Sequence, residues 1–234
     1  MLRLAVARVT ATTPGAVAMP AWLGDSERRR WSQLAPGKQA PFAASRALLR
    51  ELLQAATGVP AGAWDVSAQA GSAPMAHATR CDLAPAAVHV SLSHRLDWVA
   101  AAVADAPVGV DLECEQPPRS DPGERAALML APAEHVAWND LAPDAREAAL
   151  LSRWTAKEAW FKARPAGAAP WDFRQVSARA CAPAKANVRT WAAAPLHVAV
   201  CFAGARALAD ACCAGVAPDA STTSWFVDCA AAAD

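Results

Sequence analysis

Apolar and polar residues alternate with period two in several short stretches of the chain. Such alternation predicts β-strands, because successive side chains of a strand point to opposite faces of a sheet. The predicted strands span residues 2–9, 88–93, 97–104, 108–113, 173–177, 188–192 and 196–202. The stretch 97–104 is almost wholly apolar, which predicts a strand that is buried on both faces.

Apolar residues recur with helical spacing in two longer stretches. One predicts a helix from Pro41 to Thr57, because Gly58 is a favourable helix end. The other predicts a helix from Asp144 to about Ala163. Shorter helices are predicted at 25–31, 121–130 and 132–140, and residues 58–74 are predicted to form mostly loop.

Two predicted strands are weakly similar to one another. Residues 88–92 read Val-His-Val-Ser-Leu, residues 196–200 read Leu-His-Val-Ala-Val, and each stretch follows a helix-rich region by a similar interval. This similarity hints at two similar α+β halves. We place their boundary between residues 106 and 107, so that the halves are 1–106 and 107–234.

The strand at 109–113, Gly-Val-Asp-Leu-Glu, carries two carboxylates. Positions i and i+2 of a strand face the same way, so Asp111 and Glu113 project together while Val110 and Leu112 point into the core. Two carboxylates aimed at one point repel each other unless water or a cation lies between them. An edge strand with a solvated acidic face and a cation site are both compatible with this pattern.

The helix that ends near Ala163 places Glu158 between Lys157 and Lys162. Glu158 and Lys162 are four residues apart, which is also the spacing of an ordinary helix-surface salt bridge. Ser93 and His94 end a predicted strand, where a histidine is more often a surface or turn residue. If the fold brings these motifs together, three acidic groups suit a divalent metal that holds a polyphosphate, and the lysines can take up leaving-group charge.

The composition excludes some classes of protein. Among 234 residues, Lys+Arg and Asp+Glu are both 22, which argues against a nucleic-acid partner because such proteins need a basic excess. Hydrophobic residues make up 54% and charged residues 19%, as in globular proteins. The seven cysteines form no Cys-x-x-Cys pair and no apolar stretch predicts a membrane span, so we expect reduced thiols and a cytoplasmic protein.

The three motifs together resemble the surfactin-type 4'-phosphopantetheinyl transferases. That family has a Ser-His pair, a Gly-[Ile/Val]-Asp-x-Glu strand and a Trp-x-x-Lys-Glu-[Ala/Ser]-x-x-Lys helix, in this order. The matching parts of this chain are Ser93-His94, residues 109–113, and residues 154–162. The resemblance extends from about Glu27 to the strand near Val200.

The resemblance implies that the protein transfers the phosphopantetheine arm of coenzyme A to a serine of an apo acyl or peptidyl carrier protein and releases 3',5'-ADP. It implies a monomer that folds as a pseudo-dimer of two similar α+β halves, with the active site between them. It also implies a magnesium ion held by Asp111, Glu113 and Glu158. The sequence does not indicate whether the carrier serves fatty-acid, polyketide or peptide synthesis.

The resemblance assigns further roles residue by residue. Glu158, Lys162 and Asp111 are the expected catalytic residues, with Glu158 accepting the serine proton and Lys162 acting on the leaving phosphate. The residues expected to contact coenzyme A are Ser93, His94, Lys157, Lys162, Arg46, Arg28 and Arg30, with the last three as clamps for the 3'-phosphate.

The chain departs from the family pattern at two places. Arg95 stands where many members have a second small residue after the histidine. Residues 71–74, Gly-Ser-Ala-Pro, replace a Gly-Lys-Pro motif and lack its lysine, for which Arg80 or Arg95 could substitute. Two other functions stay open: a domain that binds coenzyme A or a carrier protein without transfer, and an unrelated magnesium-dependent phosphohydrolase.

Overall fold

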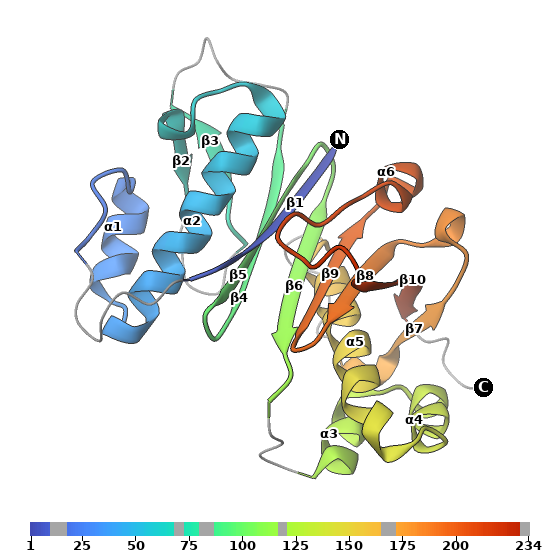
Figure 1. Cartoon of the computed structure of the whole chain (residues 1–234). Helices are drawn as coiled ribbons and strands as arrows, with labels where there is room; N and C mark the ends of the chain where they lie inside the picture. Colours follow the sequence, from blue (N-terminus) through green and yellow to red (C-terminus); the bar gives the residue numbers. More distant parts are fainter. Residues whose placement is uncertain (10–17, 68–72, 80–86, 117–120, 165–171, 230–234) are drawn as a thin grey trace.

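The computed structural model describes residues 1–9, 18–67, 73–79, 87–116, 121–164 and 172–229, and Figure 1 shows their arrangement. The strands are β1 (Leu2–Arg8), β2 (Trp64–Val66), β3 (Ala76–Ala78), β4 (His89–Arg95), β5 (Trp98–Ala104), β6 (Val108–Cys114), β7 (Val176–Ala180), β8 (Val188–Ala193), β9 (Leu196–Phe202) and β10 (Ser221–Cys229). The α-helices are α1 (Asp25–Ser32), α2 (Pro36–Thr57), α3 (Pro122–Met129), α4 (Pro132–Asn139), α5 (Pro143–Lys162) and α6 (Ala205–Ala209). The predicted α+β class is confirmed.

The same topology occurs twice along the chain. In the N-terminal half, β1 is followed by the long helix α2 and then by the hairpin β4–β5, whose second strand pairs antiparallel with β1. In the C-terminal half, β6, the long helix α5 and the hairpin β8–β9 repeat this order, and β9 pairs with β6. β10 and β7 extend the second sheet to five strands. These two halves are compatible with the expected pseudo-dimer, and the boundary between residues 106 and 107 stays a prediction.

The sequence similarity between residues 88–92 and 196–200 does not follow this repeat. The topology makes β5 the counterpart of β9, and β4 the counterpart of β8. The similarity joins β4 to β9, which hold different positions in their sheets. The two halves are similar in topology, but the similarity between these two segments is not evidence for it.

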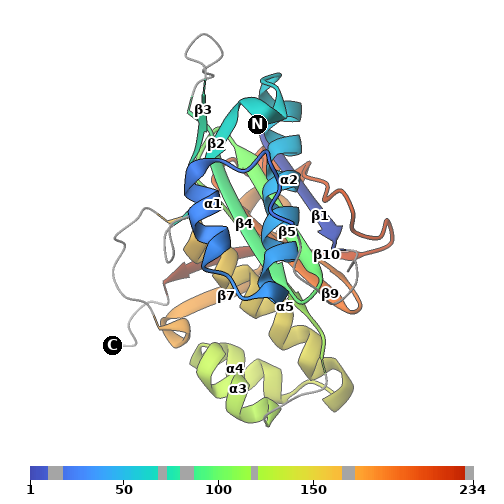
Figure 2. The ribbon, with the colours of Figure 1, turned by 90° about the vertical axis from the view of Figure 1, so that its left-hand side faces the viewer.

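Alternating side chains place each sheet between its own helix and the other half. On β5, Ala101 and Val103 pack under α2, whereas Ala100 and Ala102 enter a core shared by both halves. On β9, Ala199 packs under α5. The shared core also contains Leu4, Val6, Val110, Leu112, Val198 and Val200. Figure 2 shows α2 and α5 on opposite sides of the sheets.

A second contact ties the halves together at β1. The amide of Val6 donates a hydrogen bond of 2.8 Å to the carbonyl of Ala214, which belongs to the chain between α6 and β10. Gly215 follows with a φ of +86°, and a Cβ there would approach the Val6 carbonyl oxygen to 1.9 Å. A glycine is needed at this position because both the backbone conformation and the space exclude a side chain.

Several predicted boundaries were wrong. α2 begins at Pro36 and contains Pro41 in its interior, and residues 173–175 form a 3₁₀ turn before β7. β2, β3, α6 and β10 were not predicted.

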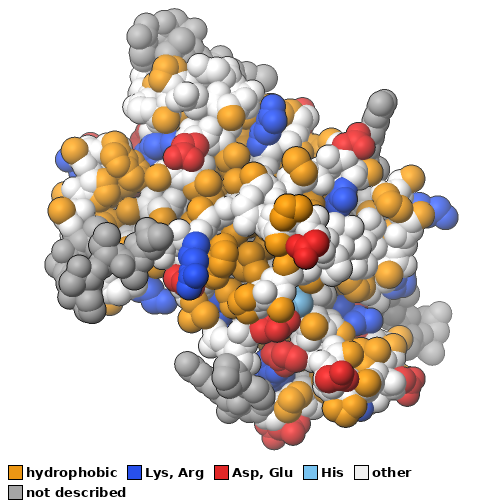
Figure 3. All heavy atoms as spheres, in the orientation of Figure 1, with side chains coloured by type: hydrophobic (Ala, Val, Ile, Leu, Met, Phe, Trp, Pro, Cys, Tyr) orange, Lys and Arg blue, Asp and Glu red, His pale blue; other side chains and the backbone are white. Residues whose placement is uncertain are grey.

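Figure 3 shows acidic side chains gathered on the lower part of one face, around the end of β6 and over α3 and α4.

Candidate functional site

β6 presents its two carboxylates to α5. Val110 and Leu112 are fully buried in the shared core, as predicted, so Asp111 and Glu113 lie on the opposite face of the strand. That face is covered: a Cβ on Gly109 would come within 1.9 Å of the Ala159 carbonyl oxygen in α5. The glycine of this motif thus lets the helix backbone rest directly on the strand. β6 is an edge strand of its sheet, as the first interpretation required, but its acidic face is covered by α5 and is not solvated.

Asp111 is held by side chains from two other elements, α5 and β4. Lys162 donates to its Oδ1 over 2.6 Å, and the Ser93 hydroxyl donates to the same oxygen over 3.0 Å. Lys162 also lies 3.3 Å from the carbonyl of Val110. The Asp111 side chain is only 7% exposed, and its Oδ2 is buried without a hydrogen-bond partner. A buried carboxylate oxygen without a partner is unfavourable, so the site has a place for another donor or cation.

Glu113 pairs with an arginine from the other half. The guanidinium of Arg95, at the end of β4, lies 3.0 Å from Glu113, and the Trp154 side chain on α5 donates a hydrogen bond to the same carboxylate. Burial raises the pKa of Glu113, Arg95 opposes this effect, and the charge of Asp111 adds to it. Arg95 was one candidate for the missing lysine, and the structure gives it a carboxylate partner. Arg80, the other candidate, lies outside the described residues.

Glu158 extends from α5 toward the two carboxylates of β6. Burial, with the charges of Asp111 and Glu113 and against the opposing charge of Lys162, raises its pKa to about 7. Because the charges of Asp111 and Glu113 both act on Glu158, the three carboxylates lie in one region, which is the condition that the proposed metal site requires. Among the described residues, however, no three acidic, histidine or cysteine side chains are close enough to hold one metal ion.

The donor set nevertheless has the chemistry of a magnesium site. Carboxylate oxygens are the ligands that this hard cation prefers, and Asp111 offers a buried oxygen without a partner. The kinds of donor present fit a magnesium ion, but the three carboxylates are not gathered around one point, and protein cations occupy Asp111 and Glu113. Coordination of one ion by all three therefore requires these two ion pairs to open.

His94 lies in a positively charged region beside this cluster. The His94 side chain is exposed, but partial desolvation by the surrounding protein lowers its pKa. The charges of Lys38, Lys162 and Arg46 lower this pKa further. Three cations around a histidine favour an anionic ligand. Sequence reasoning missed Lys38 because it started the helix at Pro41. With α2 beginning at Pro36, Lys38 and Arg46 lie two helical repeats of four residues apart, on one face.

Arg46 is less accessible than expected. It is buried, lies 3.5 Å from the Glu27 carboxylate and stacks 4.9 Å from the Phe42 ring centroid. Burial lowers its pKa to about 10, and its Nε has no hydrogen-bond partner. The charge of Arg46 lowers the pKa of His94, and a direct contact of Arg46 with a phosphate stays a prediction.

The two arginines of α1 are not brought to the cluster. Arg28 donates hydrogen bonds to the carbonyls of Ala21 and Leu23, so its guanidinium shapes the start of its own helix. Arg30 belongs to the same helix, which lies beyond α2 as seen from α5 in Figure 1. The expected role of both residues as phosphate clamps therefore has no support in this arrangement.

The prediction that Lys157 contacts the coenzyme is wrong. Its side chain is fully buried, and its ammonium donates to Glu134 over 2.5 Å, to the Met129 carbonyl over 2.9 Å and to the Phe173 carbonyl over 3.1 Å. Burial lowers its pKa. Consecutive helix residues point about 100° apart, so Lys157 faces the α3–α4 pair when Glu158 faces β6.

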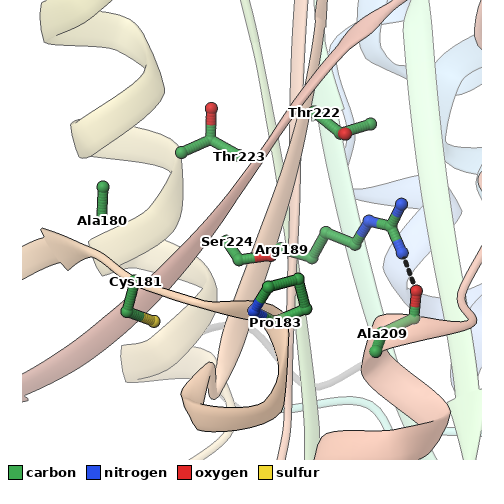
Figure 4. Close-up of a pocket in the computed structure, with 8 residues that line it drawn as sticks. All are labelled: Ala180, Cys181, Pro183, Arg189, Ala209, Thr222, Thr223 and Ser224. Carbon is green, nitrogen blue, oxygen red and sulfur yellow. Dashed lines mark hydrogen bonds between the residues drawn. The ribbon is translucent and has the colours of Figure 1, made fainter.

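A separate groove of about 340 Å³ lies on the C-terminal half between β7, β8 and β10, and Figure 4 shows its lining. Its charged residue, Arg189, donates a hydrogen bond to the Ala209 carbonyl and stacks on Trp191 at 5.3 Å. The lining residues belong neither to the carboxylate cluster nor to the positive region. The chemistry of the site is therefore found in its side chains and not in the shape of this groove.

Comparison with known proteins supports one functional class. Residues 107–212, just under half of the chain, match the family model of the 4'-phosphopantetheinyl transferase superfamily. The match includes Asp111, Glu113, Glu158 and Lys162. It begins at residue 107 and therefore does not include Ser93 and His94, which belong to the N-terminal half. No curated protein matches the chain. None of the described helices has the length and apolar character that a membrane crossing requires.

Proposed function

We propose that this protein transfers the 4'-phosphopantetheine arm of coenzyme A to a serine of an apo acyl or peptidyl carrier protein and releases 3',5'-ADP. The observation that carries the proposal is the contact of Lys162 with Asp111 and Ser93. It joins three motifs from β4, β6 and α5 in one site, and the two from the C-terminal half lie within the region that matches the transferase superfamily.

The positive region supports binding of the nucleotide end of coenzyme A. Lys38, Arg46 and His94 form one electrostatic group, and the 3'-phosphate is the anion that this group would take up. Ser93 and Lys162 lie next to the carboxylates and would contact the pyrophosphate. In this arrangement the reacting phosphorus lies between the two halves, where both can contribute side chains.

Glu158 is suited to accept a proton near neutral pH. In the metal-free site the Glu158 carboxyl has a pKa of about 7, which makes it a far better base than an ordinary glutamate, whose conjugate acid gives up its proton too easily. In the proposed reaction the carrier serine oxygen attacks the phosphorus that bears the pantetheine arm. The serine proton passes to Glu158, and the bond from that phosphorus to the bridging oxygen of 3',5'-ADP breaks.

Lys162 would act on the leaving group. The negative charge on the departing phosphate grows as the bond breaks, and a contact that strengthens at this point lowers the barrier. Asp111, Glu113 and Glu158 would hold magnesium, which supplies charge neutralisation at the pyrophosphate when it is bound. Holding these groups in fixed positions on a strand and a helix supplies most of the remaining catalysis.

Intact mass spectrometry tests the proposal. The protein is incubated with coenzyme A, magnesium and a panel of apo-carriers from fatty-acid, polyketide and peptide synthesis. We expect at least one carrier to gain the mass of one phosphopantetheine and an equal amount of 3',5'-ADP to appear. Asp111→Ala, which removes a carboxylate from the site, should abolish both products and exclude a contaminating transferase.

Two other results distinguish the alternatives. Coenzyme A that binds while every carrier stays unmodified would indicate a binding domain without transfer. Free phosphopantetheine in place of a modified carrier would indicate a phosphohydrolase. Either outcome contradicts the proposed transfer.

A further inference from the structure

Two of the three carboxylates in the site already have a cation as partner. Lys162 pairs with Asp111 at 2.6 Å, and Arg95 pairs with Glu113 at 3.0 Å. The cations come from different halves, α5 and β4, and both reach the face of β6 that meets α5. The described part of the chain contains no three ligand side chains gathered around one point. The carboxylates are thus arranged around protein cations.

The pairing at Asp111 is incomplete. The ammonium and the Ser93 hydroxyl both contact Oδ1, whereas Oδ2 is buried without a partner on a side chain that is only 7% exposed. A divalent ion at Oδ2 would lie within a few ångströms of the ammonium on Oδ1. Two positive charges at that distance repel strongly where water is partly excluded. A metal and Lys162 therefore compete for Asp111.

Lys162 can leave Asp111 more easily than a buried lysine could. Its side chain is 31% exposed, and its other contacts, to Ser93 and to the Val110 carbonyl, are long at 3.4 Å and 3.3 Å. Arg95 is half exposed, at 50%, so its pairing with Glu113 is screened by solvent. An anion that arrives beside these side chains offers each of them an alternative partner.

We propose that Lys162 and Arg95 are internal counterions that keep a divalent metal off Asp111 and Glu113 until a polyphosphate draws the two side chains away. The metal then binds tightly only together with the polyphosphate. This inference deepens the proposed function, because it sets the order in which the site is loaded. It gives Arg95, where the chain departs from the transferase pattern, a role at the metal site.

The two cations should contribute unequally. Replacing Lys162 with methionine should strengthen binding of the metal alone at least about tenfold, which is the lower end of the effect of one nearby charge on a proton at a carboxylate. Arg95→Met should strengthen it only about two- to fivefold, since exposed ion pairs are weak. Lys185→Met removes an exposed lysine that is not part of the site and should leave the affinity for metal alone unchanged.

Calorimetric titration with Mg²⁺ tests this inference, first without any phosphate and then with saturating inorganic pyrophosphate. For the wild type we expect weak binding of the metal alone and much tighter binding with pyrophosphate. For Lys162→Met we expect tighter binding of the metal alone and a smaller gain from pyrophosphate. Lys162→Gln, which keeps a hydrogen-bond donor but no charge, should behave in the same way and covers the case that the methionine variant misfolds.

The inference is overturned if both Lys162 variants bind Mg²⁺ alone no more tightly than the wild type, or if no form of the protein binds it. No carrier protein takes part in these titrations. If the protein failed to modify carriers, the proposed function would be contradicted, but the titrations would still test the counterion role. A chain that modifies carriers and shows no gain in the variants would contradict the counterion role alone.

Discussion

Lys157 and Lys162 lie little more than one turn apart on α5 and meet opposite environments. The ammonium of Lys157 has three acceptors within 3.1 Å, and its partner Glu134 accepts two further hydrogen bonds, from the backbone amides of Ala131 and Ala178. Both charged groups, the ammonium and the carboxylate, therefore have hydrogen-bond partners within the protein. This cluster joins α4, α5 and β7, and it has no capacity left for a ligand.

Lys162 belongs to a cluster that is not complete. It shares Asp111 with Ser93, one carboxylate oxygen is left without a partner, and a third of the lysine side chain reaches solvent. A satisfied buried ion pair stabilises one arrangement of the chain, whereas an unsatisfied pair is ready to exchange partners. The completeness of the hydrogen bonds separates the structural lysine, Lys157, from Lys162, for which we propose a function, although both belong to the same sequence motif.

We expect the largest loss of stability when the complete cluster around Lys157 is broken. Lys157→Met leaves the carboxylate of Glu134 charged and buried without a cation, so we expect the free energy of unfolding to fall by about 3–5 kcal/mol. Lys162→Met also removes the cation of a buried carboxylate, but the Lys162 side chain is 31% exposed, so water can reach Asp111 where the ammonium lay, and we expect a smaller loss of about 1–2 kcal/mol. Urea denaturation of the two variants measures both values, and equal losses would contradict the distinction between the clusters.

A second change separates α5 from the strand that it covers. Gly109→Ala places a methyl group against the Ala159 carbonyl, where no room exists for it. The helix must shift, and overpacking of this kind costs about 1–3 kcal/mol. Thermal denaturation should show the loss. Gly62→Ala, where a Cβ meets nothing within 4 Å, is the matched control and should show much less.

The ionisation of Glu158 should make the stability of the protein depend on pH. Its pKa is raised from 4.5 to about 7 in the folded protein, so folding favours the protonated form. The stability that this carboxyl contributes is therefore fully present below pH 4.5 and is lost as the pH rises through 7. Glu158→Gln cannot ionise, so in metal-free buffer it should become more stable relative to the wild type between pH 5 and pH 8. A difference in melting temperature that does not change with pH would contradict this.

The smallest expected effect concerns the indole that orients Glu113. Trp154→Phe keeps the aromatic contact with Phe173, whose ring centroid lies 4.0 Å away, but removes the hydrogen bond to Glu113. Loss of a donor to the charged form should raise the pKa of Glu113 further. Carboxyl carbon chemical shifts, followed in an NMR titration, report this pKa directly. An unchanged titration of Glu113 would show that the indole does not bind it in solution.

Local patterns in the sequence identified the elements that carry the chemistry. Alternation along residues 109–113 predicted that Asp111 and Glu113 share a face, and helical spacing predicted that Glu158 and Lys162 do. These relations depend on one element at a time. They hold in the structure because each element is regular where it carries the motif.

Relations between distant elements were not accessible in the same way. Glu134 is 23 residues from Lys157 and on another helix, so nothing local marks it as the partner. The start of α2 was misplaced because proline favours the first helical position, and both Pro36 and Pro41 offered one. β10 begins with four hydroxyl residues, and its place between β8 and β7 depends on pairing with strands far away in the sequence.

The most direct test of this account measures Lys162 at saturation. The rate constant for carrier modification at saturating coenzyme A, magnesium and carrier is compared with the coenzyme dissociation constant for Lys162→Ala. If Lys162 acts on the departing phosphate, the rate constant should fall about 10²–10³-fold while the dissociation constant changes much less. A dissociation constant that rises while the rate constant at saturation stays at the wild-type value would show that Lys162 only binds the coenzyme, and the catalytic role would be contradicted.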